Sequence, residues 1–169
     1  FWLNDDTTLK ENALSILISS SELKNDESII VGTTVSTKDS NRITYGGRTK
    51  SAGLLKPSKE LILCELFNGN IALIPNSVFK IVGTNDFIFR HALGDFDYGL
   101  RAGKLGVKSY IAPEMLGACD EHESLSTWWT PKQPFTKRWK AFRKPTGHNP
   151  EKFISFDKSK TGILIDICH

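Results

Sequence analysis

The first residues that could do chemistry form an acidic cluster, Asn4-Asp5-Asp6-Thr7, directly after the apolar run Phe1-Trp2-Leu3. The apolar run predicts a buried strand. Carboxylates at the end of a strand suit a hard divalent cation, Mg²⁺ or Mn²⁺, which prefers oxygen ligands and can bridge to a phosphate. A helix cap is the alternative, because Asp6 or Thr7 could accept hydrogen bonds from the free N–H groups of a following helix. The segment taken by itself leaves both interpretations open.

A second candidate is Asp95, which follows Gly94 at the start of a predicted helix over residues 95–105. The helix dipole favours an ionised carboxylate at that end. Such a carboxylate, if it faces a cleft, can accept the proton of an attacking hydroxyl group. Asp97 and Arg101 are four residues apart, which predicts an ion pair on one face of the same helix.

The elements that would position these residues alternate between helix and strand. Strands are predicted over 28–35, 61–67, 71–74 and 107–112, and a short hairpin around 42–45 within an exposed polar loop, 36–60. Helices are predicted over 7–23, 76–82, 95–105, 135–142 and near 150–156, with Asn76 or Ser77 as the cap of the second. Gly99 and Gly103 inside the third predict that a neighbour or a substrate packs closely against it. The alternation indicates an α/β fold, a mixed sheet flanked by helices.

Composition places the chain among ordinary globular proteins. Its 169 residues are 39% hydrophobic and 24% charged, enough for one domain with a sizeable core. No apolar run is long enough to cross a bilayer, so any membrane contact is expected to be peripheral or to belong to other parts of a longer parent protein. Three cysteines without metal-ligand or disulfide spacing indicate a reducing compartment, the cytoplasm or the inner face of a membrane. Among them, Cys64 is expected to be a buried small hydrophobe.

Charge is concentrated toward the end of the chain. Residues 131–160 contain nine Lys or Arg against two acids, a net charge of +7, which leaves the remainder at −4. Such a segment can meet the phosphates of a sugar nucleotide, of an anionic lipid or of nucleic acid, or it can be a solvated helix face. The adjacent Trp128 and Trp129 could stack on a sugar ring or serve as packing residues.

Three segments, taken in order, resemble the landmarks of the family-two inverting glycosyltransferases with the GT-A fold, over roughly residues 1–125. They are Trp2-Leu3-Asn4-Asp5-Asp6-Thr7; Asn68-Gly69-Asn70 with Ile74-Pro75 and Val78-Phe79-Lys80-Ile81-Val82-Gly83; and Gly94-Asp95-Phe96-Asp97-Tyr98-Gly99-Leu100-Arg101-Ala102. Each landmark by itself has little specificity, and their order carries the resemblance.

The resemblance implies roles for several residues. Asn4-Asp5-Asp6 occupies the D-x-D position that binds a divalent metal and the donor diphosphate, with Asp6 as the main ligand and Asn4 in place of the first carboxylate. Asp95 occupies the position of the catalytic base, and Gly94 replaces the acidic residue that commonly precedes it. Either Asp120 or His122 would face the metal. The remaining candidates for donor or acceptor binding are Asn68, Gly69, Asn70, Gly94, Asp97, Arg101, Trp128 and Trp129.

The resemblance also implies an organisation and an activity. Residues 1–130 would be the catalytic and acceptor-binding half of a GT-A domain, and 131–169 a basic helical extension. The nucleotide-binding half would precede Phe1, which leaves a free strand edge through which such fragments could self-associate. The expected activity is transfer of a sugar from a nucleotide-sugar donor to a saccharide or lipid-linked acceptor, which the fragment by itself would not perform. A non-catalytic carbohydrate- or nucleic-acid-binding module is the alternative, although nucleic acid is not the partner that the landmarks favour.

Overall fold

The computed structural model of the chain describes residues 1–49, 51–86, 94–121 and 134–142. The chain forms two compact units: Phe1–Thr84 with Tyr98–Glu121, and Asn85–Asp97 with His122–His169. Helix α3 (Gly94–Lys104) has its first turn in the second unit and the rest in the first. The domain boundary expected near residue 130 lies outside the described residues.

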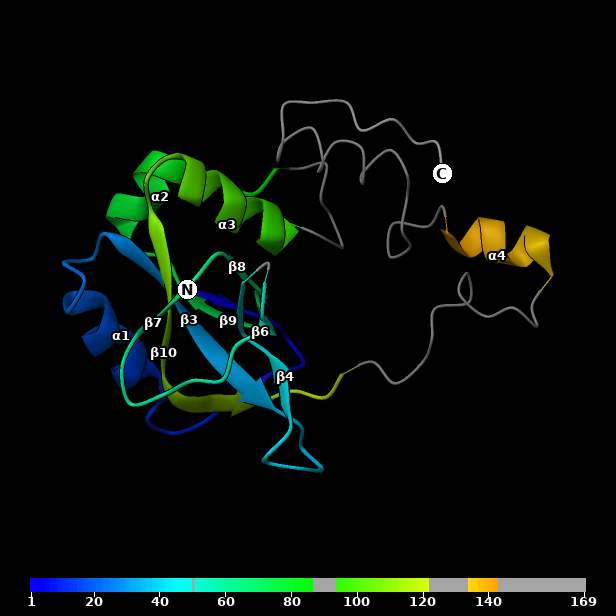
Figure 1. The fold of residues 1–169 in the computed structure, drawn as a ribbon, viewed down its shortest axis with the longest axis horizontal. Helices are drawn as coiled ribbons and strands as arrows, with labels where there is room; N and C mark the ends of the chain where they lie inside the picture. The colour runs from blue at the N-terminus through cyan, green and yellow to red at the C-terminus, as the bar shows by residue number, and fades with distance from the viewer. Residues whose placement is uncertain (50, 87–93, 122–133, 143–169) are drawn as a thin grey trace. The chain divides into compact units, whose positions relative to one another are not determined.

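A mixed sheet forms the centre of the first unit (Figure 1). Its middle strand is β3 (Ser28–Val35), a β-branched run that is buried along its whole length. The strand order is β1 (Trp2–Leu3), β9 (Ile71–Leu73), β3, β10 (Lys108–Ala118) and β2 (Thr8–Leu9). In addition, β4 (Ile43–Tyr45) pairs with β3, and β7 (Ile62–Cys64) pairs with β10. A small second sheet has the order β6 (Gly53–Leu54), β5 (Gly47–Thr49), β8 (Leu66–Phe67).

Strand direction determines where the polar segments gather. Strands β3 and β10 are parallel, with Ser28 opposite Lys108 and Val35 opposite Ala118. Strand β1 runs in the same direction as β3, because both are antiparallel to β9. The carboxyl ends of β1, β3 and β10 therefore lie at the same edge of the sheet, which we call the carboxyl edge.

Helices cover both faces of this sheet. Ile30 of β3 packs in a core cluster with Ala13 and Leu17 of α1 (Ala13–Glu22). Its neighbours Ile29 and Val31 belong to the other cluster, which includes residues of α2 (Asn76–Val82) and α3. Because successive strand residues point to opposite faces, α1 covers one face and α2 with α3 the other. The arrangement confirms the expected α/β class with a mixed sheet.

The helix predicted over residues 7–23 is wrong in its first half. Thr8 and Leu9 form β2 and pair with Ala118 and Gly117 of β10, and the helix begins only at Ala13. The residue before it, Asn12, makes no side-chain cap hydrogen bond. The cap interpretation of Asp6 and Thr7 is therefore wrong, since the backbone between them and the helix is committed to the sheet.

Four further predictions are corrected. The strand over 61–67 divides at Glu65, because β7 pairs with β10 whereas β8 pairs with β5. The polar loop 36–60 contains three strands, so its hairpin at 42–45 is instead β4 paired with β3. Strand β10 continues past Ala112 to Ala118 through irregular register, with Glu114 at a φ of +65°. The residue before α2 is Pro75, and neither Asn76 nor Ser77 caps that helix through a side-chain hydrogen bond.

Other elements are confirmed. They include β3, β9, the end of α2 at Gly83, the end of α3 before Gly106, and a helix over Phe135–Phe142, α4, in the second unit. Gly83 and Gly106 have φ values of +78° and +82°, which glycine adopts without the strain of a side chain. The helix near 150–156 lies outside the described residues. Within the described part of the chain, no helix has both the length and the apolar composition needed to cross a membrane.

Candidate functional site

The acidic segment forms a turn at the carboxyl edge. The Thr7 N–H donates to the Asn4 carbonyl over 3.2 Å, so Asp5 and Asp6 occupy the two central positions of the turn. Asn4, Asp5 and Asp6 are all exposed. We call residues 4–7 the acidic turn. It presents two carboxylates to solvent from a backbone held at both ends.

Asn70 holds the acidic turn in place. It lies directly before β9 and is only 5% exposed. Its carbonyl accepts from the Asn4 N–H at 3.2 Å, and its side-chain amide donates to the Thr7 hydroxyl at 3.3 Å and to the Cys119 sulfur at 3.4 Å. A buried side chain with these partners joins the acidic turn to the ends of β9 and β10.

Cys119 follows β10 and lies beneath the acidic turn. Its thiol is buried, and burial raises its pKa, with the neighbouring Asp6 carboxylate adding to the increase. Hydrogen bonds from Thr7 and Asn70 act in the opposite direction without reversing it. The group therefore remains a neutral thiol at neutral pH and does not compete with the carboxylates for a hard cation.

Asp120 ties the ends of β3 and β10 together. Its carboxylate accepts from the Ser36 hydroxyl at 2.7 Å, the Thr37 N–H at 2.9 Å and the Thr37 hydroxyl. The hydrogen bond from the Thr37 hydroxyl, followed by those from Ser36 and the Thr37 backbone, lowers the pKa of Asp120 to about 2. Both oxygens thus already accept hydrogen bonds within the protein. Beside Asp120, Glu121 forms an ion pair with Arg42.

The two residues just before Asn70 contact different strands, Gly69 contacting β1 and Asn68 contacting β5. A Cβ on Gly69 would lie 2.8 Å from the Trp2 indole, so only glycine allows this approach. Asn68 accepts a hydrogen bond from the Arg48 guanidinium at 3.2 Å. Of the three residues assigned to ligand binding, Gly69 packs against β1 and Asn70 holds the acidic turn, whereas Asn68 contacts β5.

The first turn of α3, in the second unit, contains both of its candidate carboxylates. Asp95 is half-buried and accepts a hydrogen bond from the Phe96 N–H at 2.9 Å. Asp97 is 2% exposed. Gly94 is the first residue of the helix. The helix dipole favours the ionised form of a carboxylate at this position.

Arg101, one to two turns further along α3, is held by the end of α2. Its guanidinium donates to the carbonyls of Val82 and Thr84, each at 3.0 Å, and lies 5.2 Å from the centre of the Tyr98 ring. A cation beside the last carbonyls of a helix is favourable. This role in fixing α3 to α2 was not predicted, and the ion pair with Asp97 stays a prediction.

The structure thus gathers Asn4, Asp5, Asp6, Asn70 and Asp120 at the carboxyl edge of the first unit. His122, Trp128 and Trp129 lie outside the described residues. Sequence reasoning missed the contribution of Ser36, Thr37 and Cys119. The first two were detectable in principle, since they follow directly on a strand that was predicted correctly.

The fit of a divalent cation to this edge depends on how many ligands the protein supplies. The described residues contain no group of three or more His, Cys, Asp or Glu side chains arranged to hold a metal ion. Mg²⁺ is commonly held by one or two carboxylates, with waters and substrate phosphates completing its shell. Asp6, with Asp5 or Asn4, fits a cation shared with a phosphate ligand and does not fit a closed protein cage.

Comparison of the chain with known protein families, with curated protein sequences and with solved structures finds no match. Function is therefore inferred from the geometry of the site and from the landmarks in the sequence.

Proposed function

We propose that the chain is part of a glycosyltransferase that moves a sugar from a nucleotide-sugar donor to an acceptor hydroxyl with inversion. The observation that carries the proposal is the acidic turn at the carboxyl edge, where β1, β3 and β10 end together. In α/β sheets ligands bind at the carboxyl ends of the strands. The order of the three landmarks along the sequence also supports a glycosyltransferase.

The donor side of the reaction would use the acidic turn. Asp6, assisted by Asp5 or Asn4, would hold Mg²⁺ or Mn²⁺ together with the donor diphosphate. The bound cation would neutralise the negative charge that develops on the leaving diphosphate. Asn70 and the Thr7 hydroxyl would keep the turn in one geometry, so that little reorganisation is needed when the ligand binds.

The acceptor side would use Asp95. As the acceptor oxygen forms its bond to the anomeric carbon, the bond from that carbon to the diphosphate breaks and the acceptor proton passes to the Asp95 carboxylate. One displacement of this kind inverts the anomeric carbon. The position of Asp95 in the first turn of α3 supports the role, because the helix dipole favours a negative charge there.

The metal-binding step is tested on the chain itself by electron paramagnetic resonance of Mn²⁺, with and without a nucleoside diphosphate. We expect Asp6→Asn to weaken Mn²⁺ binding at least about tenfold, since it removes the main charged ligand. Glu60→Gln removes the same charge from another exposed carboxylate and should leave Mn²⁺ binding unchanged. Equal Mn²⁺ affinity in the Asp6→Asn variant and the unmodified chain would exclude the acidic turn as the metal site.

The base is tested in a sugar-transfer assay on the protein in its full natural length. Asp95→Asn should lower the rate of transfer by about 10²- to 10⁴-fold, the usual contribution of a general base, while donor binding persists. Unchanged turnover would remove Asp95 from the mechanism. Ligand binding that is indifferent to both Asp6 and Asp95 would point to the alternative, a non-catalytic binding module.

A further inference from the structure

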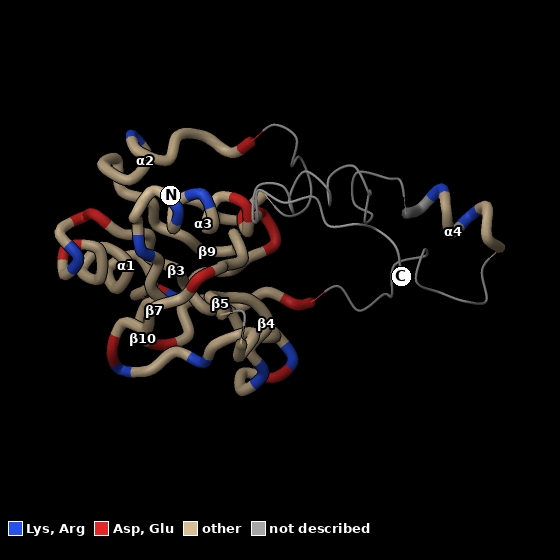
Figure 2. Tube along the Cα trace, turned by 45° about the horizontal axis from the view of Figure 1, so that its top comes forward, with Lys and Arg blue, Asp and Glu red and all other residues tan. Residues whose placement is uncertain are grey.

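Helix α4 combines two properties that the proposed transfer reaction does not use. The first is its charge. The segment Phe135–Phe142 contains Lys137, Arg138 and Lys140 and no acidic residue, and Figure 2 shows Lys and Arg without Asp or Glu along it. It lies within the stretch 131–160, whose net charge is +7.

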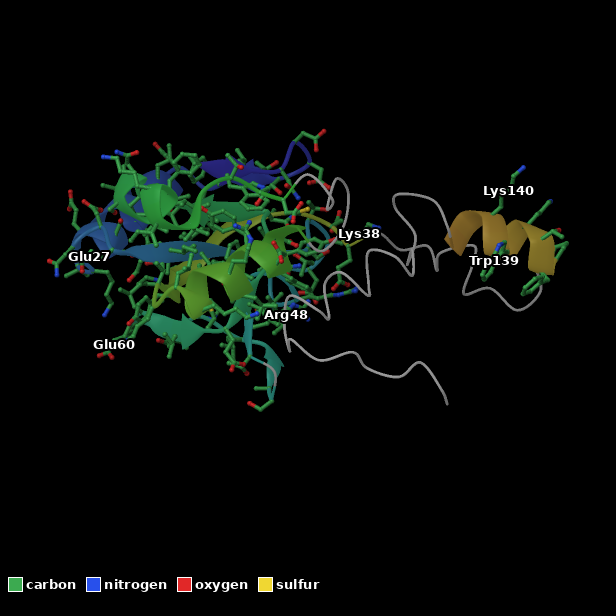
Figure 3. All side chains as sticks on the ribbon, turned by 90° about the horizontal axis from the view of Figure 1, so that it is seen from above. Glu27, Lys38, Arg48, Glu60, Trp139 and Lys140 are labelled. Carbon is green, nitrogen blue, oxygen red and sulfur yellow. The ribbon has the colours of Figure 1, made fainter. Side chains whose placement is uncertain are left out.

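The second property is an exposed aromatic pair. Phe135 and Trp139 are one helical turn apart, and their rings stack with centroids 6.1 Å apart and an angle of 21° between the planes. Phe135 is 72% exposed and Trp139 48% exposed. Figure 3 shows Lys140 projecting from α4 away from Trp139. The helix therefore displays large apolar surface on one side and cationic groups on another.

We propose that α4 docks on the surface of a membrane that contains anionic lipids. A helix with aromatic residues on one face and Lys or Arg on another lies in the plane of the interface, with its apolar face among the headgroups and acyl chains. Lysines near an anionic leaflet each strengthen such binding, and Trp is favoured at the headgroup level. The proposal is independent of the proposed transfer reaction.

The geometry favours lipid over single-stranded nucleic acid. Nucleic-acid binding of this kind requires aromatic faces on which bases can stack. In α4 the two rings stack with an offset, their centroids 6.1 Å apart, so part of one face of each lies against the other ring. A bilayer interface requires no open ring face, because it buries the outer surface of the pair as a unit. With eight residues, the helix lies on the membrane and does not span it.

The test is co-sedimentation of the full chain with vesicles of phosphatidylcholine, with and without phosphatidylglycerol. The chain should sediment with the mixed vesicles and remain in solution with phosphatidylcholine alone. The double variant Lys137→Gln, Lys140→Gln should bind the mixed vesicles roughly 30-fold more weakly, about fivefold for each cation lost. Phe135→Ser should weaken binding about tenfold, because the aromatic ring no longer contributes buried apolar surface.

Two matched variants separate α4 from general effects of charge and apolarity. Lys56→Gln, Lys59→Gln removes two exposed cations of the first unit, and Phe79→Ser removes an exposed aromatic residue of α2. Both should bind vesicles like the unmodified chain. The proposal would be overturned if the matched variants lost as much vesicle affinity as the α4 variants. It would also be overturned if the unmodified chain bound equally to vesicles with and without phosphatidylglycerol. Binding of a single-stranded oligonucleotide that depends on Lys137 and Lys140, without vesicle binding, would replace it by nucleic-acid binding.

Discussion

At the scale of single residues, Asn70 has the largest effect on the arrangement of the carboxyl edge. Its backbone and side chain together contact Asn4, Thr7 and Cys119, which follow two different strands. The sequence marks Asn70 only as the last residue of a turn. Its contacts depend on residues 49 to 66 positions away, which no local pattern records.

Replacing Asn70 tests this positioning role. We expect Asn70→Ala to lower the free energy of unfolding by about 1–3 kcal/mol, because the Thr7 hydroxyl and the Cys119 sulfur lose a buried hydrogen-bond partner. Mn²⁺ affinity should fall about tenfold as well, since the acidic turn loses its side-chain contact at Thr7. Urea unfolding and electron paramagnetic resonance measure the two effects. Asn41→Ala, on an exposed loop, serves as the control and should change neither.

Asp120 provides a test by pH. Its pKa falls from the ordinary 3.8 to about 2 in the folded chain. The ionised carboxylate therefore stabilises the folded state fully at a pH above its pKa in the unfolded chain. This stabilisation is lost as the pH falls through its pKa in the folded chain. The Asp120→Asn variant should therefore be less stable than the unmodified chain at neutral pH. The difference should shrink between about pH 4 and pH 2. Urea unfolding at several pH values measures it, and a difference that does not depend on pH in this range would contradict the assignment.

At the scale of elements, α3 packs closely against β8 of the small second sheet at one of its two internal glycines. A Cβ on Gly99 would lie 3.2 Å from the ring of Phe67, which is fully buried, whereas a Cβ on Gly103 would meet nothing within 4 Å among the described residues. The close approach predicted from the two glycines is thus confirmed at Gly99 and stays a prediction at Gly103. The four-residue spacing of the two glycines places them on one face of the helix. It does not predict at which turn that face contacts a neighbouring element.

The two glycines make a matched pair of variants. Gly103→Ala should raise the free energy of unfolding by about 0.5–1 kcal/mol, the helix-propensity gain of alanine over glycine. Gly99→Ala offers the same gain but pushes against Phe67, and overpacking of this kind costs about 1–3 kcal/mol, so the variant should be no more stable or less stable. Urea unfolding compares them. A stabilising Gly99→Ala would mean that Phe67 can move aside.

Elements were predictable where one local signal dominates. The β-branched run Ser28–Val35 gave the central strand with its observed bounds, and Gly83 and Gly106 marked two helix ends. Thr8–Leu9 was read as helix because Leu9 fits the spacing of Ala13 and Leu17, although pairing with β10 places it in the sheet. A two-residue strand has no periodicity of its own, so only its partner defines it.

At the scale of the whole molecule, the first unit is a three-layer arrangement with α1 on one face of the sheet and α2 with α3 on the other. Alternating residues of β3 contribute to the core beneath α1 and to the core beneath α2 and α3, so both helical layers pack against the same strand. The polar groups of the acidic turn, of Ser36 and Thr37, and of Asp120 come from segments far apart in the chain. They gather because three strands that run in the same direction end at one edge.

Sequence alone predicts the α/β class, most of the longer elements, the acidic segment and Asp95 as candidates, and the basic character of residues 131–160. These depend on residue type and short spacing, which the chain carries locally. Three facts emerge only from the folded chain: Asp6 and Thr7 do not cap a helix, Asn70 and Cys119 lie beneath the acidic turn, and Asp120 ties β3 to β10. Those facts follow from strand pairing and burial, which arise from contacts between residues distant in sequence.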